Sequence, residues 1–285
     1  MKLKIKPFFD HPTYTLTYVV YHEDSRDAVV IDPVLDYDPS SSKVSQKSFD
    51  EVCQFVDSHK LNLLYVLETH AHADHLSSSQ YFKAKYPNIK IAIGENIKKV
   101  QEVFKDIFNL GSGFKTDGSQ FDILLKDNEV LNAGTLKFKV INTPGHTPAC
   151  VSYLIEDALF AGDTLFMPDY GTGRCDFPAG DASIMYQSIT KLYNLPDSTR
   201  VFVGHDYQPG GRGVEFETSI GEQKNKNIQL NSKVTKEEYV SFREKKDKTL
   251  AAPRLLLPSV QVNIHAGQFP SPDSNGVKYL KIPIR

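Results

Sequence analysis

The sequence contains no tryptophan, and only three cysteines and three methionines occur among its 285 residues. The cysteines, Cys53, Cys150 and Cys175, are odd in number and widely separated. This pattern argues against a disulfide framework and is typical of a reducing compartment, so we expect a cytoplasmic protein. Each cysteine is expected to be a small buried side chain, although its neighbours set Cys175 apart.

The chain also lacks an excess of charge of one sign and a long apolar run. Its net charge is −2, which is no global signature for binding nucleic acid or an anionic membrane. No apolar run approaches the ~20 residues that span a bilayer. The segment 1–6 alternates lysine with apolar residues and lacks the apolar core of a secretory signal. We therefore expect neither a nucleic acid nor a membrane as a partner.

The patterns of strands and helices alternate along most of the chain. Residues 3–32 are rich in aromatic and β-branched side chains around a polar turn, which predicts a hairpin. Residues 36–48 are rich in Ser, Asp and Lys and predict a solvated insertion loop rather than an active-site lid. Periodicity predicts helices over 49–59, 76–86, 95–108, 184–192 and 236–250 and strands over 63–67, 89–93, 136–141, 151–155, 158–161 and 200–203.

The composition changes after about residue 212. Residues 217–250 are polar and rich in Lys and Glu, residues 253–264 form an apolar run that favours a strand, and the tail 276–285 ends in an extended segment. We therefore expect a main domain over 1–212 and a C-terminal extension over 213–285 that packs on it.

Potential metal ligands are densest between His70 and His75, where the sequence reads His-Ala-His-Ala-Asp-His. The apolar run 63–67 precedes this cluster directly, so a buried strand is expected to deliver it to the strand end. Histidine is the commonest neutral metal ligand, and aspartate is a hard anionic ligand. The cluster therefore predicts a metal centre.

Three more predicted strands end in a potential ligand, namely His146, Asp163 and His205. A loop that curls at a strand end can turn His70 and His72 towards one ion and Asp74 and His75 towards a second. His146 would complete the first site, His205 the second, and Asp163 is placed to bridge them. Packing alone does not explain five histidines and two aspartates at strand ends.

This ordered set of motifs resembles the metallo-β-lactamase superfamily, over about residues 10–210. The resemblance implies an α/β (α+β) fold, the αββα sandwich, with the metal site in a cleft at one edge of two packed sheets. A finer resemblance to persulfide dioxygenases rests on residues 171–177, 204–207 and 257–263. Residues 32–39 resemble a bacterial branch called β-lactamase hydrolase-like proteins.

The finer resemblance implies one Fe(II) per chain, held by His70, His146 and Asp163. Two histidines and one carboxylate leave coordination positions open for a substrate and O2. The remaining group, which comprises His72, Asp74, His75 and His205, would then orient these ligands by hydrogen bonds or hold a second metal.

The same resemblance implies oxidation of glutathione persulfide by O2 to sulfite and glutathione, in a homodimer. The substrate-binding residues would be Arg174, Asp176 and Tyr207. The guanidinium of Arg174 suits a carboxylate of the glutathione moiety, but an equally good interpretation pairs it with Asp176. Tyr207 is expected either to hydrogen-bond near the substrate sulfur or to pack.

Two other functions compete with this interpretation. A hydroxyacylglutathione hydrolase (glyoxalase II) would use the same ligands to hold two zinc ions and hydrolyse a thioester. The motif at 173–177, and the lack of that family's long basic helical C-terminus, favour the dioxygenase. A non-catalytic metal- or glutathione-binding protein ranks third, because it would require a broken ligand set and no ligand is missing.

Overall fold

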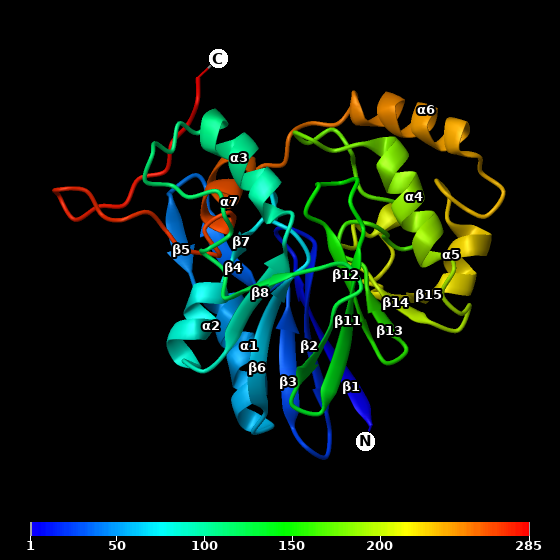
Figure 1. Cartoon of the computed structure of the whole chain (residues 1–285), viewed down its shortest axis with the longest axis horizontal. Helices are drawn as coiled ribbons and strands as arrows, with labels where there is room; N and C mark the ends of the chain where they lie inside the picture. The colour runs from blue at the N-terminus through cyan, green and yellow to red at the C-terminus, as the bar shows by residue number, and fades with distance from the viewer. Residues whose placement is uncertain (1, 285) are drawn as a thin grey trace.

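The computed structural model describes residues 2–284 and consists of two sheets packed face to face between two layers of helices (Figure 1). The first sheet has the order β1-β2-β3-β6-β8-β9. Its strands are β1 (Leu3–Asp10), β2 (Thr15–His22), β3 (Asp27–Ile31), β6 (Asn62–Glu68), β8 (Lys90–Gly94) and β9 (Ile123–Leu125). The hairpin predicted over residues 3–32 is confirmed as β1, β2 and β3.

The second sheet runs from β10 to β15 in chain order. Its strands are β10 (Val130–Ala133), β11 (Leu136–Asn142), β12 (Val151–Ile155), β13 (Ala158–Phe160), β14 (Arg200–Phe202) and β15 (Glu217–Ser219). The inner faces of the two sheets share one core, in which Tyr18 and Val20 of the first sheet meet Phe138 and Tyr153 of the second. The αββα architecture expected from the sequence is therefore present.

Helices cover the outer faces (Figure 1). On one side lie α1 (Lys47–Ser58), α2 (Ser79–Lys85) and α3 (Ile97–Ile107), and on the other lie α4 (Ala182–Leu192), α5 (Ile220–Lys226) and α6 (Lys236–Asp247). The apolar stripe of α1, with Val52 and Val56, packs on Val30 of β3. Likewise Met185 and Ile189 of α4 pack on the second sheet. The helices predicted around residues 49–59, 95–108, 184–192 and 236–250 are confirmed within a few residues.

The loops that carry the predicted ligands leave the sandwich at one edge. Strands β3, β6 and β8 are parallel, as are β13 and β14, so their carboxyl ends point the same way. The loops after β6, β11, β13 and β14 hold His70, His146, Asp163 and His205, respectively. The sequence-based expectation that these strand ends meet is confirmed.

The insertion loop predicted over 36–48 is wrong. This segment contains β4 (Val34–Asp38) and β5 (Lys43–Ser45), which pair antiparallel, and then the start of α1. The side chain of Asp38 closes the hairpin turn by accepting hydrogen bonds from Ser40 and Ser41, and Asp36 accepts two from Ser48 at the start of α1. The polar residues that suggested a loop thus close a turn and begin a helix.

The helix predicted to start directly after the histidine cluster begins later. Leu76 and Ser77 form a short strand, β7, that pairs antiparallel with β4, and α2 starts only at Ser79. Asp74 and His75 therefore precede a strand and do not lie at a helix N-terminus.

The strand predicted over 253–264 is also wrong, because α7 (Leu256–Asn263) occupies this segment. Pro258 lies in the first turn of α7, where a missing N–H is tolerated. Both apolar and polar residues of α7 are buried, including Val260, Val262 and Asn263. The local β-branched pattern therefore reflects burial on several faces rather than a strand. The tail expected to be extended forms no strand up to residue 284, and Arg285 lies outside the described residues.

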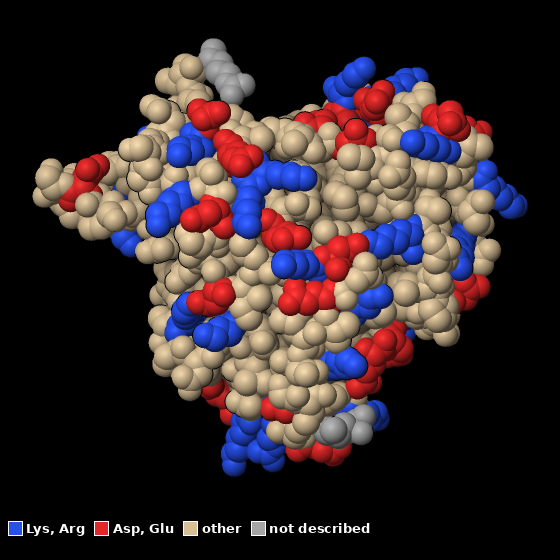
Figure 2. All heavy atoms as spheres, in the orientation of Figure 1, with Lys and Arg blue, Asp and Glu red and all other residues tan. Residues whose placement is uncertain are grey.

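The segment after residue 212 belongs to the same packed structure. It supplies β15 to the second sheet and α5 and α6 to its cover, and α7 packs beside β7. Among residues 2–284, no helix is both long and apolar enough to cross a membrane. Acidic and basic side chains are interspersed over the face shown in Figure 2.

Candidate metal centre

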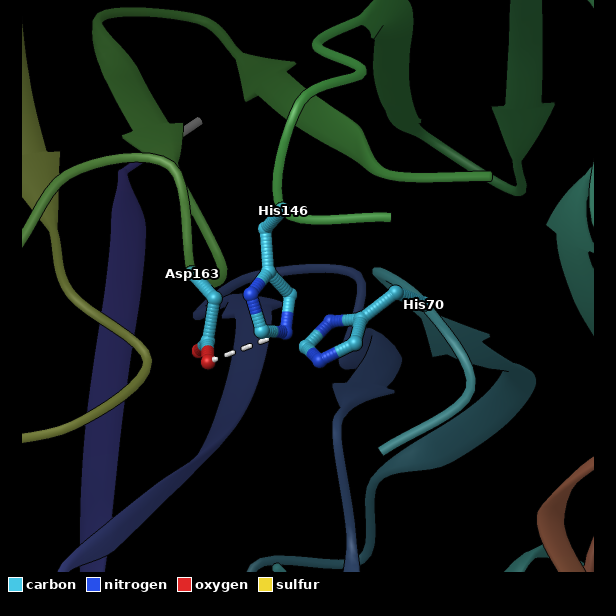
Figure 3. Close-up of side chains that lie close together, drawn as sticks. All are labelled: His70, His146 and Asp163. Atoms are coloured by element: carbon cyan, nitrogen blue, oxygen red, sulfur yellow. Dashed lines mark ion pairs between the residues drawn. The ribbon is translucent and has the colours of Figure 1, made fainter. Parts of the chain in front are cut away.

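Three of the predicted ligands, His70, His146 and Asp163, converge on one point (Figure 3). One potential ligand atom of each lies within 4.8 Å of the others. Nε2 of His146 lies 3.6 Å from Oδ2 of Asp163, and the rings of His70 and His146 have their centroids 5.0 Å apart. All three side chains are buried.

Hydrogen bonds on the far nitrogens turn the two imidazoles towards each other. Nδ1 of His146 lies 2.7 Å from the carbonyl oxygen of Arg174, to which it donates, and Nδ1 of His70 lies 3.0 Å from the hydroxyl of Thr69. These contacts leave the Nε2 atoms free to bind a metal. Burial lowers the pKa of His70 well below its ordinary value, so this ring is neutral and can act as a ligand.

The residues present fit a metal ion. Nε2 of His70 is buried and has no hydrogen-bond partner among the described residues. A buried polar atom without a partner is costly. An ion held by two imidazoles and one carboxylate would satisfy this atom and match the ligand chemistry of Fe(II), and such a site also accepts zinc.

His205 approaches Asp163 from the other side. Its Nε2 lies 3.3 Å from Oδ1 of Asp163 and 3.5 Å from Oδ2 of Asp74. Burial by itself would lower the pKa of His205, but these two carboxylates raise it to about 9. For Asp163, burial acts in the other direction and would raise the pKa. The imidazoles of His205, His70 and His146 nevertheless hold the pKa of Asp163 below its ordinary value. Asp163 is therefore an anion between two sets of histidines.

His72 does not join His70 in the converging group. Its Nε2 lies 3.0 Å from Oδ1 of Asp32 and 3.4 Å from Oε2 of Glu68. Burial disfavours a charged imidazole, but Asp32 and Glu68 together raise the pKa of His72 well above its ordinary value. The expectation that His70 and His72 face one ion is therefore not met, because two buried carboxylates turn the Nε2 of His72 away.

Asp32 and Glu68 are members of the site that the sequence motifs did not predict. Asp32 also accepts hydrogen bonds of 2.7 Å from the backbone N–H and the hydroxyl of Thr69, and its φ of 49° lies in the left-handed region. A non-glycine residue rarely adopts that region without a structural demand. The one sequence feature that could have drawn attention to Asp32 is its position between a predicted strand and Pro33.

Asp74 and His75 form a second candidate group with His72. Nδ1 of His75 lies 3.2 Å from Oδ2 of Asp74, and Asp74 also approaches His205. The structure thus brings together most of the residues that the sequence suggested for a second ion, with Asp163 between the two groups.

A cavity of about 300 Å³ opens onto this centre. Asp163, His146, Arg174 and Tyr207 line it, together with Lys246 of α6. Arg174 makes hydrogen bonds of 2.6 and 2.7 Å to the two carboxylate oxygens of Asp176, so the pairing weighed from the sequence is present. Tyr207 stacks on His205. Arg174 and Tyr207 thus lie in the wall of the cavity that reaches the metal centre.

Cys175 belongs to the same loop as Arg174 but is buried and free, and burial raises the pKa of its thiol. Its backbone N–H donates to Asp247 of α6. Burial and the nearby carboxylate of Asp247 outweigh the positive charge of Arg243, so the thiolate is disfavoured and the side chain packs like a small hydrophobic residue.

The C-terminal helix α7 also reaches the histidine loop. The side-chain amide of Asn263 donates to the carbonyl oxygens of His72 and His75, both at 2.8 Å, and its oxygen accepts from the N–H of Ser77. This role could not be predicted from the sequence, because the partners of Asn263 lie 186 to 191 positions away in the chain.

Comparison with known proteins places this geometry in context. The family model described as "Metallo-beta-lactamase superfamily" matches residues 12–205. "Glyoxylase B2" of Dictyostelium discoideum is 47% identical over 99% of this chain and 97% of that protein. A "Beta-lactamase hydrolase-like protein" of Agrobacterium fabrum is 44% identical over 98% of this chain and 64% of that protein.

Persulfide dioxygenases are more distant in sequence. Human mitochondrial "Persulfide dioxygenase ETHE1" is 29% identical over 71% of this chain and 68% of that protein. The crystal structure of ETHE1 from Myxococcus xanthus superimposes with a TM-score of 0.75 and 31% identity, over 93% of this chain and 100% of that chain. All three resemblances drawn from the sequence motifs are thus confirmed.

Proposed function

The chain belongs to the metallo-beta-lactamase superfamily, and from this premise we propose that it is an iron-dependent dioxygenase that oxidises glutathione persulfide with O2. The observation that carries the proposal is the buried group of His70, His146 and Asp163, from which Asp32 and Glu68 keep the Nε2 of His72 away. Two histidines and one carboxylate with open positions are typical of non-haem Fe(II) oxygenases.

His70, His146 and Asp163 would hold the ion. When bound, Fe(II) would supply adjacent open positions at which a persulfide sulfur and O2 react. The carbonyl of Arg174 keeps the proton of His146 on Nδ1, which leaves Nε2 as a ligand. His205 balances the charge of Asp163 and orients its second oxygen. The overall change consumes one persulfide, one O2 and one water and yields sulfite, glutathione and two protons.

The cavity suits an anionic thiol substrate. Arg174, Lys246 and Arg254 line it, and Tyr207 lies against His205 beside the metal centre. Glutathione carries two carboxylates that cationic side chains at the cavity entrance would attract. We further propose that Arg174 and Asp176 act as one recognition unit in which Asp176 fixes the plane of the guanidinium.

Likeness to ETHE1 in sequence and in fold supports this choice. By the same likeness we propose a homodimer whose reactants are glutathione persulfide and O2. The few, widely separated cysteines favour a cytoplasmic location, and the net charge of −2 and the lack of a long apolar run favour neither a nucleic-acid nor a membrane partner.

A dinuclear zinc thioester hydrolase is the second candidate. The group formed by His72, Asp74 and His75 favours it, because these residues lie close enough to hold another cation. The names of the relatives from Dictyostelium and Agrobacterium point to hydrolase chemistry as well. In that function these residues, together with His70, His146 and Asp163, would hold two zinc ions, which would supply the nucleophile for hydrolysis of the thioester of a glutathione conjugate.

Metal analysis combined with two assays separates these functions. Purified protein should contain about one iron per chain and consume O2 with glutathione persulfide, while releasing sulfite. About two zinc ions per chain, hydrolysis of a hydroxyacylglutathione thioester and no O2 uptake would reject the dioxygenase. The variant His146→Ala should be inactive in both assays and serves as the background.

A further inference from the structure

Helix α6 buries an unusual set of side chains. Its buried residues are Tyr239, Arg243 and Asp247, with Arg243 and Asp247 only 1% and 5% exposed. Nη2 of Arg243 lies 2.5 Å from Oδ1 of Asp247. A buried ion pair contributes little net stability, because desolvation offsets the attraction between the charges. The pair therefore calls for an explanation other than stability.

Both members of this pair hold the loop 171–176. Nη1 of Arg243 donates to the carbonyl oxygen of Thr172 at 3.2 Å, and Oδ2 of Asp247 accepts from the N–H of Cys175 at 2.9 Å. These two tethers flank Gly173 and Arg174. The ion pair therefore sets the position of the peptide groups between Thr172 and Cys175.

The tethered stretch contacts two of the proposed metal ligands directly. The carbonyl oxygen of Arg174 accepts the hydrogen bond from Nδ1 of His146. Gly173 packs so closely on Asp163 that an added Cβ would lie 2.0 Å from its carbonyl oxygen. Any shift of this stretch would move the acceptor of His146 and the support of Asp163 together.

We propose that Arg243 and Asp247 are positioning residues of the metal centre, which act on His146 and Asp163 through the loop 171–176. The polar, Lys- and Glu-rich C-terminal segment thus completes the site rather than only covering the sheet. This inference rests on the metal site of the proposed function and not on its substrate, so it holds equally for iron or zinc. Partners that orient a metal-bound histidine typically contribute 10- to 100-fold to metal affinity.

Cobalt(II) binding to the metal-free full-length protein tests the proposal. Cobalt is titrated into each variant while its d–d absorption is recorded, and thermal unfolding of the metal-free form is measured in parallel. The main variant is Arg243→Met with Asp247→Leu, because apolar residues of similar volume often replace a buried ion pair without loss of stability. The matched control is Arg200→Met with Asp157→Leu, which removes a bidentate ion pair. This pair lies where β13 and β14 begin, whereas the loops of the metal centre follow the ends of these strands.

The double variant should bind cobalt about 10- to 100-fold more weakly and show an altered d–d spectrum, while the control stays within about twofold of the wild type. A folded double variant with wild-type cobalt affinity and spectrum would overturn the proposal. Should that variant not fold, Asp247→Asn provides the test, since it keeps the shape and removes the charge. Unchanged cobalt binding by folded Asp247→Asn would then overturn it.

His146→Ala distinguishes failure of this inference from failure of the proposed metal site. If His146→Ala binds cobalt like the wild type, the metal site itself is wrong. If His146→Ala loses cobalt but the Arg243 and Asp247 variants do not, only the positioning role is wrong.

Discussion

At the scale of single residues, the site depends on which atom of each side chain is already engaged. Nδ1 of His146 is used by a carbonyl oxygen, and Nε2 of His72 faces two carboxylates. A histidine ring has only two nitrogens, so once one of them is engaged, only the other can bind a metal. The residue type alone does not say whether a histidine binds a metal, and the polar contacts around its ring decide this.

Arg174→Ala should raise the KM for glutathione persulfide about tenfold and change kcat little, because a charged hydrogen bond to the substrate would be lost in ground and transition states alike. The backbone carbonyl that holds His146 is retained in this variant. Steady-state O2 uptake measures both constants. Lys191→Ala, which removes an exposed partner of Asp127, is the control. An unchanged KM would remove Arg174 from substrate binding.

Asn263→Asp should weaken metal binding about tenfold, because a carboxylate cannot donate to the carbonyl oxygens of His72 and His75. Unfolding should also become easier by about 1–3 kcal/mol, since two buried carbonyl groups lose their partner. Metal titration and thermal unfolding check both effects. Asn225→Asp changes an amide that is exposed on α5 and should have neither effect.

At the scale of elements, short connections rather than long helices shape the site. The loop 171–176 touches two ligands, and the short strand β7, which pairs with β4, carries the chain out of the histidine loop. Loops on a rigid scaffold commonly carry function, because their ends are fixed while their side chains vary.

Gly173→Ala should abolish metal binding or reduce it by at least about tenfold, because its Cβ would collide with the carbonyl of Asp163 at 2.0 Å. Gly213→Ala is the matched control, since an added Cβ there meets nothing within 4 Å. Cobalt titration of both variants provides the measurement. Equal binding by the two would show that the loop tolerates displacement.

Asp122 links α2 to β8 and should make stability depend on pH. Burial acts to raise its pKa, but the N–H of Ile91 and the ammonium of Lys83 outweigh burial and hold the pKa below its ordinary value. A carboxyl with a lower pKa when folded stabilises the protein above its unfolded pKa, and this contribution disappears as pH falls through the folded value. Asp122→Asn should therefore lower the free energy of unfolding by at most about 1 kcal/mol at pH 7.

The difference between wild type and Asp122→Asn should begin to shrink as the pH falls below about 4, the pKa of an unfolded aspartate, and should continue to shrink towards the lower folded pKa. Urea unfolding of both proteins between pH 3 and pH 7 is the measurement. A difference that is the same at every pH would contradict the assignment.

At the scale of the whole molecule, the C-terminal segment is structurally inseparable from the sandwich. It contributes β15 to the second sheet and buries Ile220, Tyr239 and Val262 almost completely. The core and the metal centre therefore share elements that the composition of the sequence had set apart.

A chain that ends at Arg212 should not unfold cooperatively on heating, because it would expose the surface that Ile220, Tyr239 and Val262 cover. A chain that ends at Pro270 loses mainly exposed residues and should keep the cooperative transition. Differential scanning calorimetry compares the two with the full chain. A cooperative transition in the 1–212 chain would mean that the sandwich folds without its C-terminal segment.

Residue patterns alone were enough to predict the fold family, most strands and helices, and the strand ends that meet at the candidate metal centre. This information is local, because a strand that ends in a histidine or an aspartate can be recognised from a short window. Local patterns also produced the errors. Residues 253–264 favour a strand by composition, but 256–263 form α7, because burial of apolar and polar residues on several faces removes the one-sided apolar pattern of a surface helix.

The tertiary structure was needed to show which of the predicted ligand side chains share a point in space. Asp32 and Glu68 withdraw the Nε2 of His72, Asn263 holds the histidine loop, and Arg243 with Asp247 tethers the loop behind His146. Each of these contacts joins segments whose order in the chain says nothing about their distance. The packing of the two sheets and the C-terminal helices creates them, so they follow from the whole fold and not from any motif.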